Sequence, residues 1–213
     1  MTTQYRLPRS IQIISGCLLL WTSLFSNLQA APPPTILVLG DSLSAAYGIN
    51  EEQGWVALLQ QQLRKGDSPY QVVNISISGE TSQGGLSRLP HALEQYHPQL
   101  LILALGANDG LRGNSLKQLK QNLERIIKLA QQQKSKVLLV GMQLPPNYGA
   151  QFSQKFRSLF ADVAKQQALP FVPFLLEKIA GDNGFFQADG LHPRAQAQPL
   201  LLETVWPELE PLL

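Results

Sequence analysis

Three residues of the types used in acyl transfer stand in short polar turns that are far apart in the sequence. Ser42 lies three residues after an apolar run that ends at Leu39, while Asp189 and His192 lie three residues apart near the C-terminus. A serine hydroxyl becomes nucleophilic when a histidine accepts its proton, and a carboxylate can fix the tautomer of that histidine. His91 and His97 lie in a polar stretch typical of a solvated helix face. His192, oriented by Asp189, is therefore the candidate general base for Ser42.

Two further turns contain groups that can stabilise an oxyanion. Gly79 lies in the segment 76–82, and Asn108 lies in the segment 106–110. Backbone N–H groups and an Asn amide are common oxyanion donors, and a glycine lets a ligand approach its backbone closely. The candidate donors are the N–H groups of Ser42 and Gly79 and the side chain of Asn108. Plainer roles stay open: a helix cap for Ser42, a turn glycine for Gly79 and a backbone-capping turn residue for Asn108.

The segments that precede these turns have the pattern of buried strands. Short continuous apolar runs are typical of strands covered on both faces. Such runs occur at 35–39, 72–75, 100–105 and 137–140, with a weaker candidate at 171–174. Apolar residues at helical spacing predict helices at 116–130 and 152–163. Two more helices are predicted, one at 55–63 and one that begins near Pro199 and is disturbed at Pro207.

Strands that alternate with helices imply a parallel sheet joined by right-handed crossovers. We therefore predict an α/β protein, a three-layer α/β/α sandwich with five strands. Such sheets bind ligands beyond the carboxyl ends of their strands, near the point where the strand order reverses. Since the turns of Ser42, Gly79 and Asn108 each follow a predicted strand, we expect these residues to meet at that edge.

Taken together, the polar turns resemble the conserved blocks of the GDSL or SGNH hydrolase family. The matching blocks, in the family's order, are Gly40-Asp41-Ser42-Leu43, Gly79, Gly106-Ala107-Asn108-Asp109 and Asp189-Gly190-Leu191-His192. The resemblance implies that Ser42 is the nucleophile, His192 the general base and Asp189 its orienting partner. It also implies that Gly79 and Asn108 donate to the oxyanion, and that the fold is the flavodoxin-like sandwich of SGNH hydrolases.

Longer stretches at 76–82, 108–113 and 144–149 are similar to the exported thioesterase, lysophospholipase and arylesterase branch of that family. This resemblance implies a serine esterase that forms an acyl-enzyme on Ser42 and hydrolyses acyl thioesters, aryl esters and lysophospholipids. We expect the segments 111–112 and 144–148 to form an apolar acyl site, with Arg112 directed at a phosphate or an aromatic leaving group. The alternatives are a carbohydrate acetylesterase of the same fold and a non-catalytic ligand-binding domain.

The N-terminal segment has the pattern of an export signal. Two arginines precede an apolar run at 11–25, and Ala30 is a candidate cleavage site. The run is interrupted by polar residues and is shorter than the roughly 20 apolar residues that a bilayer span needs. We expect a cleaved signal peptide at 1–30, a single hydrolase domain at 31–213, and a periplasmic or secreted protein with no stable membrane anchor. A retained anchor and lipidation of Cys17 are the alternatives.

Charge and cysteine content exclude several classes of protein. Residues 31–213 carry 15 basic and 15 acidic side chains, which argues against nucleic acid as the main partner. The single cysteine excludes an internal disulfide, a cysteine zinc site and an iron–sulfur cluster. Phosphoryl transfer through Asp41 would lack a second nearby carboxylate to hold magnesium. We therefore expect a monomer that acts on a small acyl ester or thioester and uses neither a cofactor nor a metal.

Overall fold

A parallel β-sheet forms the centre of the protein in a computed structural model that describes residues 1–4 and 32–213. Its strands are β1 (Thr35–Gly40), β2 (Gln71–Asn74), β3 (Leu100–Ala104), β4 (Lys136–Val140) and β5 (Phe171–Val172). The order across the sheet is β2-β1-β3-β4-β5, and each neighbouring pair is parallel. Because the order reverses between β1 and β3, the carboxyl ends of these two strands frame the crevice where such folds bind ligands.

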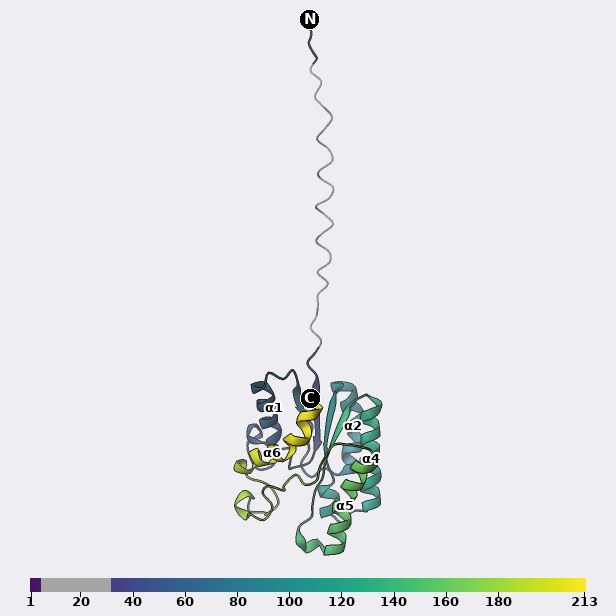
Figure 1. Cartoon of the computed structure of the whole chain (residues 1–213), viewed down its shortest axis with the longest axis vertical. Helices are drawn as coiled ribbons and strands as arrows, with labels where there is room; N and C mark the ends of the chain where they lie inside the picture. The colour runs from purple at the N-terminus through teal and green to yellow at the C-terminus, as the bar shows by residue number, and fades with distance from the viewer. Residues whose placement is uncertain (5–31) are drawn as a thin grey trace. The chain divides into compact units, whose positions relative to one another are not determined.

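Helices cover both faces of the sheet, with α1 and α6 on one face and α2, α4 and α5 on the other (Figure 1). The helices are α1 (Trp55–Lys65), α2 (Ser82–Tyr96), α3 (Ala107–Leu111), α4 (Leu116–Gln132), α5 (Ala150–Gln166) and α6 (Gln198–Leu209). Short 3-10 turns occur at Glu51–Gln53, Pro146–Tyr148, Asn183–Phe185, Ala195–Ala197 and Glu210–Leu212. The three-layer sandwich predicted from the alternating pattern is thereby confirmed.

Alternate residues of the strands build two apolar cores, one on each face. In β1, Ile36 and Val38 belong to the core beneath α1 and α6, whereas Leu37 and Leu39 belong to the core beneath α2, α4 and α5. All four side chains are fully buried. The strand is therefore apolar throughout, because neither of its faces meets water.

Helix α2 extends well beyond the helical stretch that the sequence indicated. Helix α2 begins well before the polar stretch of His91 and His97, where a helical face was expected, and both histidines are exposed. Pro207 lies inside α6, which continues to Leu209, so the helix is disturbed at this residue but does not end there. Pro207 leaves the carbonyl of Glu203 without its helical partner, but Glu203 is exposed, so water can take that place.

Residues 33–213 form one compact unit. Apart from its first four residues, the predicted signal peptide lies outside the described part of the chain. No helix in the described part is long and apolar enough to cross a membrane.

Candidate active site

Ser42, His192 and Asp189 form a continuous chain of hydrogen bonds at the carboxyl edge of the sheet. The Oγ of Ser42, in the turn after β1, lies 2.9 Å from Nε2 of His192. On the other side of the imidazole, Nδ1 lies 2.7 Å from Oδ2 of Asp189. When Nδ1 carries the proton and donates it to the carboxylate, Nε2 has a lone pair for the Ser42 hydroxyl. The three residues singled out in the sequence thus meet in the arrangement that a general base requires.

The loop that carries His192 is held by its own backbone hydrogen bonds. An antiparallel bridge pairs Phe186 with Pro193, and the N–H of Gln187 donates to the carbonyl of His192 at 2.8 Å. Asp189 closes the turn within this loop, because its Oδ1 accepts the N–H of His192 at 3.0 Å. Asp189 therefore fixes both the backbone and the ring of His192.

The same contacts keep Asp189 ionised. Hydrogen bonds from the backbone N–H groups of His192 and Leu191 lower the pKa of the Asp189 carboxyl to about 2. A carboxylate anion at this position favours the imidazolium that forms when His192 takes a proton. The ring of Tyr47 lies against His192, with centroids 4.4 Å apart, and the Tyr47 carbonyl accepts a hydrogen bond from Gln187. These contacts tie the His192 loop to the segment that follows Ser42.

Asp41 is buried directly beneath the candidate nucleophile. Its side chain is 2% exposed, and its Oδ1 accepts the N–H of Leu43 at 3.1 Å. Its Oδ2 lies 3.4 Å from Nδ2 of Asn108. Burial raises the pKa of the Asp41 carboxyl to about 6. Asp41 thus shapes the Ser42 turn and contacts Asn108, a role that the sequence analysis did not identify.

Gly79 determines the shape of the turn that follows β2. The N–H of Glu80 donates to the carbonyl of Ile77 at 3.1 Å, Gly79 has a φ of +78°, and Ser78 has an ordinary negative φ. This combination defines a type II turn, whose third residue needs a positive φ and is therefore usually glycine. In a type I turn the central peptide is flipped, so the N–H of Gly79 would point the opposite way.

Asn108 is placed by the sharp turn from β3 into α3. Gly106 has a φ of +120°, and a Cβ at this position would come within 2.8 Å of Cζ of Phe160. Only glycine fits such a turn without a shift of its neighbours. The Asn108 side chain faces the turn after β2, where its Nδ2 donates to the carbonyl of Glu80 at 3.0 Å. The segments of Gly79 and Asn108 are therefore in direct contact, as the sequence predicted.

A buried polar network that the sequence analysis missed anchors α3 to α2 and α4. The carboxylate of Asp109 accepts hydrogen bonds from the N–H and the hydroxyl of Ser82, at 2.8 and 2.7 Å. The Nδ2 of Asn122 donates to the same hydroxyl at 3.0 Å. All three side chains are almost completely buried, so a lost partner would leave an unsatisfied polar group. The network holds the beginning of α3, and with it Asn108, against the helices behind it.

Arg112 is directed at the protein itself and not at the cavity beside Ser42. Its Nη2 donates to the carbonyl of Gly79 at 2.8 Å. The expectation that Arg112 points to a phosphate or an aromatic leaving group therefore differs from the structure. The sequence placed Arg112 in the correct segment, but which acceptor it finds depends on the turn after β2, a distant part of the chain.

A cavity of about 530 Å³ opens beside Ser42, Asn108 and His192. Its apolar lining comes from the segments after β3, β4 and β5 and comprises Leu111, Met142, Leu144, Pro145, Pro146, Phe174, Leu176, Phe186 and Leu191. Leu111, Leu144, Pro145 and Pro146 of this wall were predicted, whereas Met142 and the part that follows β5 were not. Tyr148 does not line the cavity, because its hydroxyl donates to the carbonyl of Leu111 and so supports the wall from behind.

The predicted site residues are not equivalent in their access to this cavity. Ser42, Asn108 and His192 line it directly, whereas Asp189 and Gly79 do not. Asp189 reaches the cavity only through the imidazole of His192. Gly79 lies next to the cavity, since the residue that follows it accepts the hydrogen bond from Asn108.

Several known proteins are similar to this chain in sequence. Residues 38–199 match the model of the GDSL-like lipase/acylhydrolase family. The chain is 50% identical to esterase TesA of Pseudomonas aeruginosa over 201 residues, which cover 94% of this chain and 98% of that protein. It is 40% identical to thioesterase 1/protease 1/lysophospholipase L1 of Escherichia coli K12 over 187 residues, 88% of each protein.

A solved structure is similar as well. The psychrotrophic esterase EstA from Pseudoalteromonas sp., in a crystal structure inhibited by monoethylphosphonate, matches with a TM-score of 0.80 at 42% identity. The match covers 83% of this chain and 97% of that one. The fold and the relatives together define an α/β/α serine esterase. The chain belongs to the GDSL-like lipase/acylhydrolase family, as its four sequence blocks predicted.

Proposed function

We propose that this protein hydrolyses carboxylic esters and thioesters by transferring the acyl group first to Ser42 and then to water. The observation that carries the proposal is the chain of hydrogen bonds from Ser42 through His192 to Asp189, at the mouth of an apolar cavity. The names of the E. coli relative support acyl thioesters and lysophospholipids as substrates. Aryl esters contain the same acyl group and belong to the same substrate class.

In the first half of the reaction, Oγ of Ser42 attacks the acyl carbonyl while Nε2 of His192 takes the hydroxyl proton. Asp189 stabilises the resulting imidazolium. The tetrahedral intermediate then collapses, the bond to the alcohol or thiol breaks, and His192 returns the proton to the leaving group. In the second half, His192 activates a water molecule in the same way, and the acyl-enzyme is hydrolysed to the carboxylic acid.

The oxyanion formed in each half is stabilised by the N–H groups of Ser42 and Gly79 and by Nδ2 of Asn108. In the free protein, Nδ2 donates to the carbonyl of Glu80 at 3.0 Å and has a long contact of 3.4 Å with Asp41. The proton on the Asp41 side is the one available to the oxyanion, because its present hydrogen bond is weak. The contact with Glu80 would then keep the amide in place throughout the reaction.

The lining of the cavity favours apolar acyl groups. Each methylene that leaves water contributes roughly 0.8 kcal/mol, which is about a four-fold gain in binding. The predominantly apolar wall offers few hydrogen-bonding groups to a sugar. We therefore expect esters with medium or long acyl chains to be better substrates than acetylated carbohydrates.

Two experiments test this function. Labelling with a fluorophosphonate should modify Ser42 in the wild type and leave the Ser42→Ala variant unlabelled, whereas a non-catalytic binding domain would not react at Ser42. A panel of acyl-CoA thioesters, p-nitrophenyl esters from acetyl to palmitoyl, a lysophospholipid and an acetylated xylan oligosaccharide then compares kcat/KM. A higher value for the sugar ester would replace the proposal with a carbohydrate acetylesterase.

The contribution of the cavity wall is tested with a pair of leucine variants. Leu144 lines the cavity, whereas Leu58 on α1 packs in the core of the opposite face. Leu144→Ala should shift the profile of kcat/KM against acyl-chain length, and Leu58→Ala should leave that profile unchanged. Identical profiles for the two variants would place the acyl group elsewhere.

We further propose that residues 1–30 direct the chain out of the cytoplasm and are removed there. The support is the sequence of this segment, with arginines before an apolar run and Ala30 at its end. N-terminal sequencing of the protein from a periplasmic fraction should begin at or next to Ala31. Retention of Met1, or a lipidated Cys17 at the N-terminus, would contradict this proposal.

A further inference from the structure

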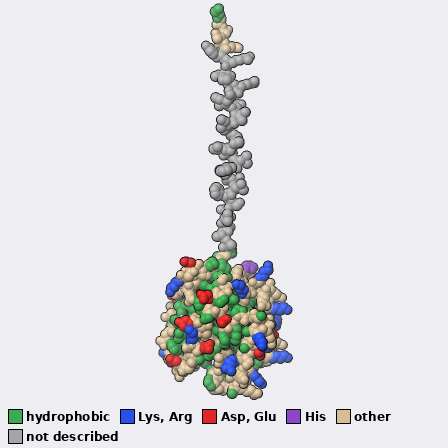
Figure 2. All heavy atoms as spheres, viewed as in Figure 1, with side chains coloured by type: hydrophobic (Ala, Val, Ile, Leu, Met, Phe, Trp, Pro, Cys, Tyr) green, Lys and Arg blue, Asp and Glu red, His purple; other side chains and the backbone are tan. Residues whose placement is uncertain are grey.

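The charges of this protein are divided between different parts of its surface. Positions 116–166, which comprise α4, β4 and α5, contain nine Lys or Arg and two Asp or Glu. The remainder of residues 32–213 contains six Lys or Arg and 13 Asp or Glu. The net charge of zero is therefore the sum of a segment with a formal charge of +7 and a remainder with a formal charge of −7. In Figure 2 the basic side chains gather on the side where Figure 1 places α4 and α5.

The basic face is formed by the Lys and Arg residues of α4 and α5. Its members are Lys117, Lys120, Arg125, Lys128, Lys155, Arg157 and Lys165. All of them except the half-buried Lys120 are exposed, and within the described part of the chain only Lys120 pairs with a carboxylate, that of Glu124. Lys120 also donates to Gln166 at 2.9 Å, so α4 and α5 lie side by side and present one continuous face. Apart from the charge of Lys120, the positive charge of the basic face is therefore available to a partner.

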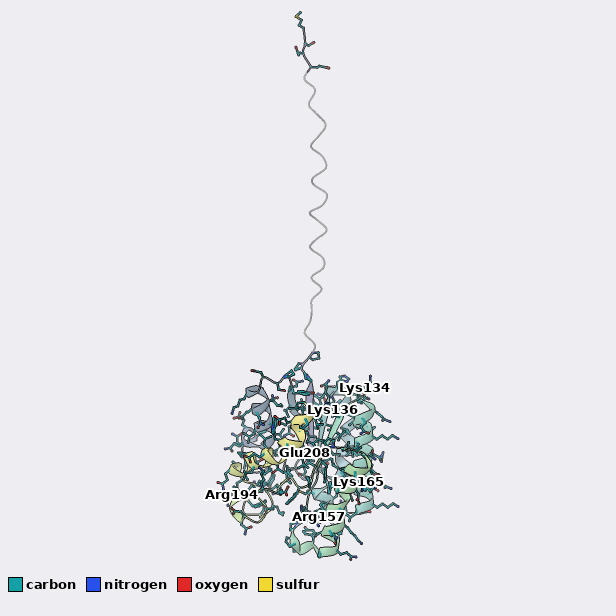
Figure 3. All side chains as sticks on the ribbon, in the orientation of Figure 1. Lys134, Lys136, Arg157, Lys165, Arg194 and Glu208 are labelled. Carbon is teal, nitrogen blue, oxygen red and sulfur yellow. The ribbon has the colours of Figure 1, made fainter. Side chains whose placement is uncertain are left out.

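The basic face reaches the mouth of the active-site cavity. Arg157 lines a neighbouring hollow together with Gln143 and Leu144, and both of these residues also line the cavity of Ser42. Figure 3 places Lys134, Lys165 and Arg157 along the side of α4 and α5, with Arg157 nearest the lower end of that side. A negatively charged surface that contacts this face would thus lie next to the entrance for the acyl group.

We propose that the basic face docks the enzyme on an anionic lipid surface, with the cavity mouth at the edge of the contact. The choice of a lipid as the occupant rests on the proposed function, since acyl substrates with long chains reside in such surfaces. Among the described residues, none of the large exposed apolar side chains lies on α4 or α5. The contact between this face and the lipid surface is therefore electrostatic. Nucleic acid fits less well, as the described part of these helices has no exposed aromatic side chain on which bases could stack.

The test is co-sedimentation of the mature protein with vesicles of ether-linked lipids, which have no ester for the enzyme to cleave. We compare phosphatidylcholine vesicles with vesicles containing about 30% phosphatidylglycerol, at salt concentrations of about 20 and about 500 mM. Each basic side chain near an anionic leaflet increases partition by roughly five-fold at moderate salt. The wild type should therefore bind the anionic vesicles at low salt and dissociate from them at high salt.

Two triple variants with the same net charge locate the binding surface. K117Q/R125Q/K128Q removes three charges from the basic face and should lower partition by about 10²-fold. R64Q/K65Q/K178Q removes three charges from α1 and from the segment before α6 and should change partition less than about three-fold. Hydrolysis of soluble p-nitrophenyl butyrate should be the same in both variants, which establishes that they are folded.

Three outcomes would overturn the docking proposal: equal binding to neutral and anionic vesicles, equal losses in the two triple variants, or tighter binding of a short DNA duplex than of the anionic vesicles. The last would assign the basic face to nucleic acid. Since vesicle binding is measured without hydrolysis, a failure of the proposed esterase activity would appear in the ester assay and not in sedimentation. The two proposals can therefore fail separately.

Discussion

The guanidinium of Arg112 donates a hydrogen bond of 2.8 Å to the carbonyl of Gly79. Asn108, four residues earlier, donates to the next carbonyl along the chain, that of Glu80. Two side chains after β3 thus hold two successive carbonyls of the type II turn after β2. Because the direction of the Gly79 N–H depends on that turn, Arg112 is placed to position a proposed oxyanion donor without touching the substrate.

Arg112→Gln is expected to lower kcat about ten-fold with little change in KM, because an oxyanion donor acts on the transition state and not on the bound ester. Arg112→Lys retains a cationic donor and should lose less activity. Arg64→Gln, at an exposed arginine of α1, is the matched control and should behave as the wild type. Steady-state kinetics with p-nitrophenyl butyrate give both constants. A higher KM with an unchanged kcat would assign Arg112 to substrate binding.

Removal of the nucleophile or of the base should abolish most activity while the fold is retained. Ser42→Ala and His192→Ala are each expected to lower kcat by several powers of ten, up to about 10⁶, because the residues of the proposed triad would act as a unit. For the same reason, the double variant should be little worse than either single variant. Circular dichroism checks the fold. More than about a tenth of wild-type activity in Ser42→Ala would exclude it as the nucleophile.

Asn108→Ala is expected to reduce kcat by about 10² to 10³ with a nearly constant KM, since the oxyanion that Asn108 is proposed to bind exists only after the attack. Asn114→Ala, at an exposed position a short distance along the chain, is the control and should retain full activity. Melting temperatures are measured in parallel. If Asn108→Ala instead lowered the melting temperature and left kcat near normal, its role would be structural.

Asp41 should make the protein less stable as the pH rises from about 4 to about 6. Burial raises its pKa from 3.8 to about 6, so between these values the folded protein holds a proton that the unfolded chain has lost. The unfolding free energy should then fall by up to about 3 kcal/mol from this group. The lowered pKa of Asp189 has the opposite effect on the unfolding free energy, and it acts below about pH 4. Stability from this group is lost as the pH falls from about 4 towards 2.

Urea unfolding at several pH values between about 4 and 7 measures this effect. Asp41→Asn cannot ionise, so its unfolding free energy should change less over this range than that of the wild type. The comparison depends on the slope and not on the absolute stability, which the new amide beside Asn108 will also change. Parallel curves for the two proteins would contradict the raised pKa of Asp41.

Local patterns in the sequence were sufficient for the sheet and for the family. A strand buried on both faces must be apolar along its whole length, so β1, β3 and β4 were visible as continuous apolar runs. The four polar blocks predicted the family, because the residues of each block are adjacent in the chain. The meeting of Ser42 and Asn108 followed from topology, since each lies in a turn after a predicted strand, whereas His192 was paired with Ser42 on chemical grounds.

The early start of α2 could not be read locally. Gly84, Gly85 and Pro90 lower its helix propensity, yet Leu86 and Leu89 are buried beneath it, and this burial outweighs the local preference. Here tertiary packing decided the secondary structure.

The sequence by itself determined which residues stand at the edge of the sheet, whereas the tertiary structure decided what each of them contacts. Arg112 contacts the Gly79 carbonyl, and Asp109 contacts Ser82. Both contacts form because β2 and β3 lie on either side of β1 in the sheet, so that the turns after β2 and β3 are close in space. Hydrogen-bond partners and the raised pKa of Asp41 depend on groups that are distant in the chain and close in space. Sequence spacing contains no information about such distances until the fold is known.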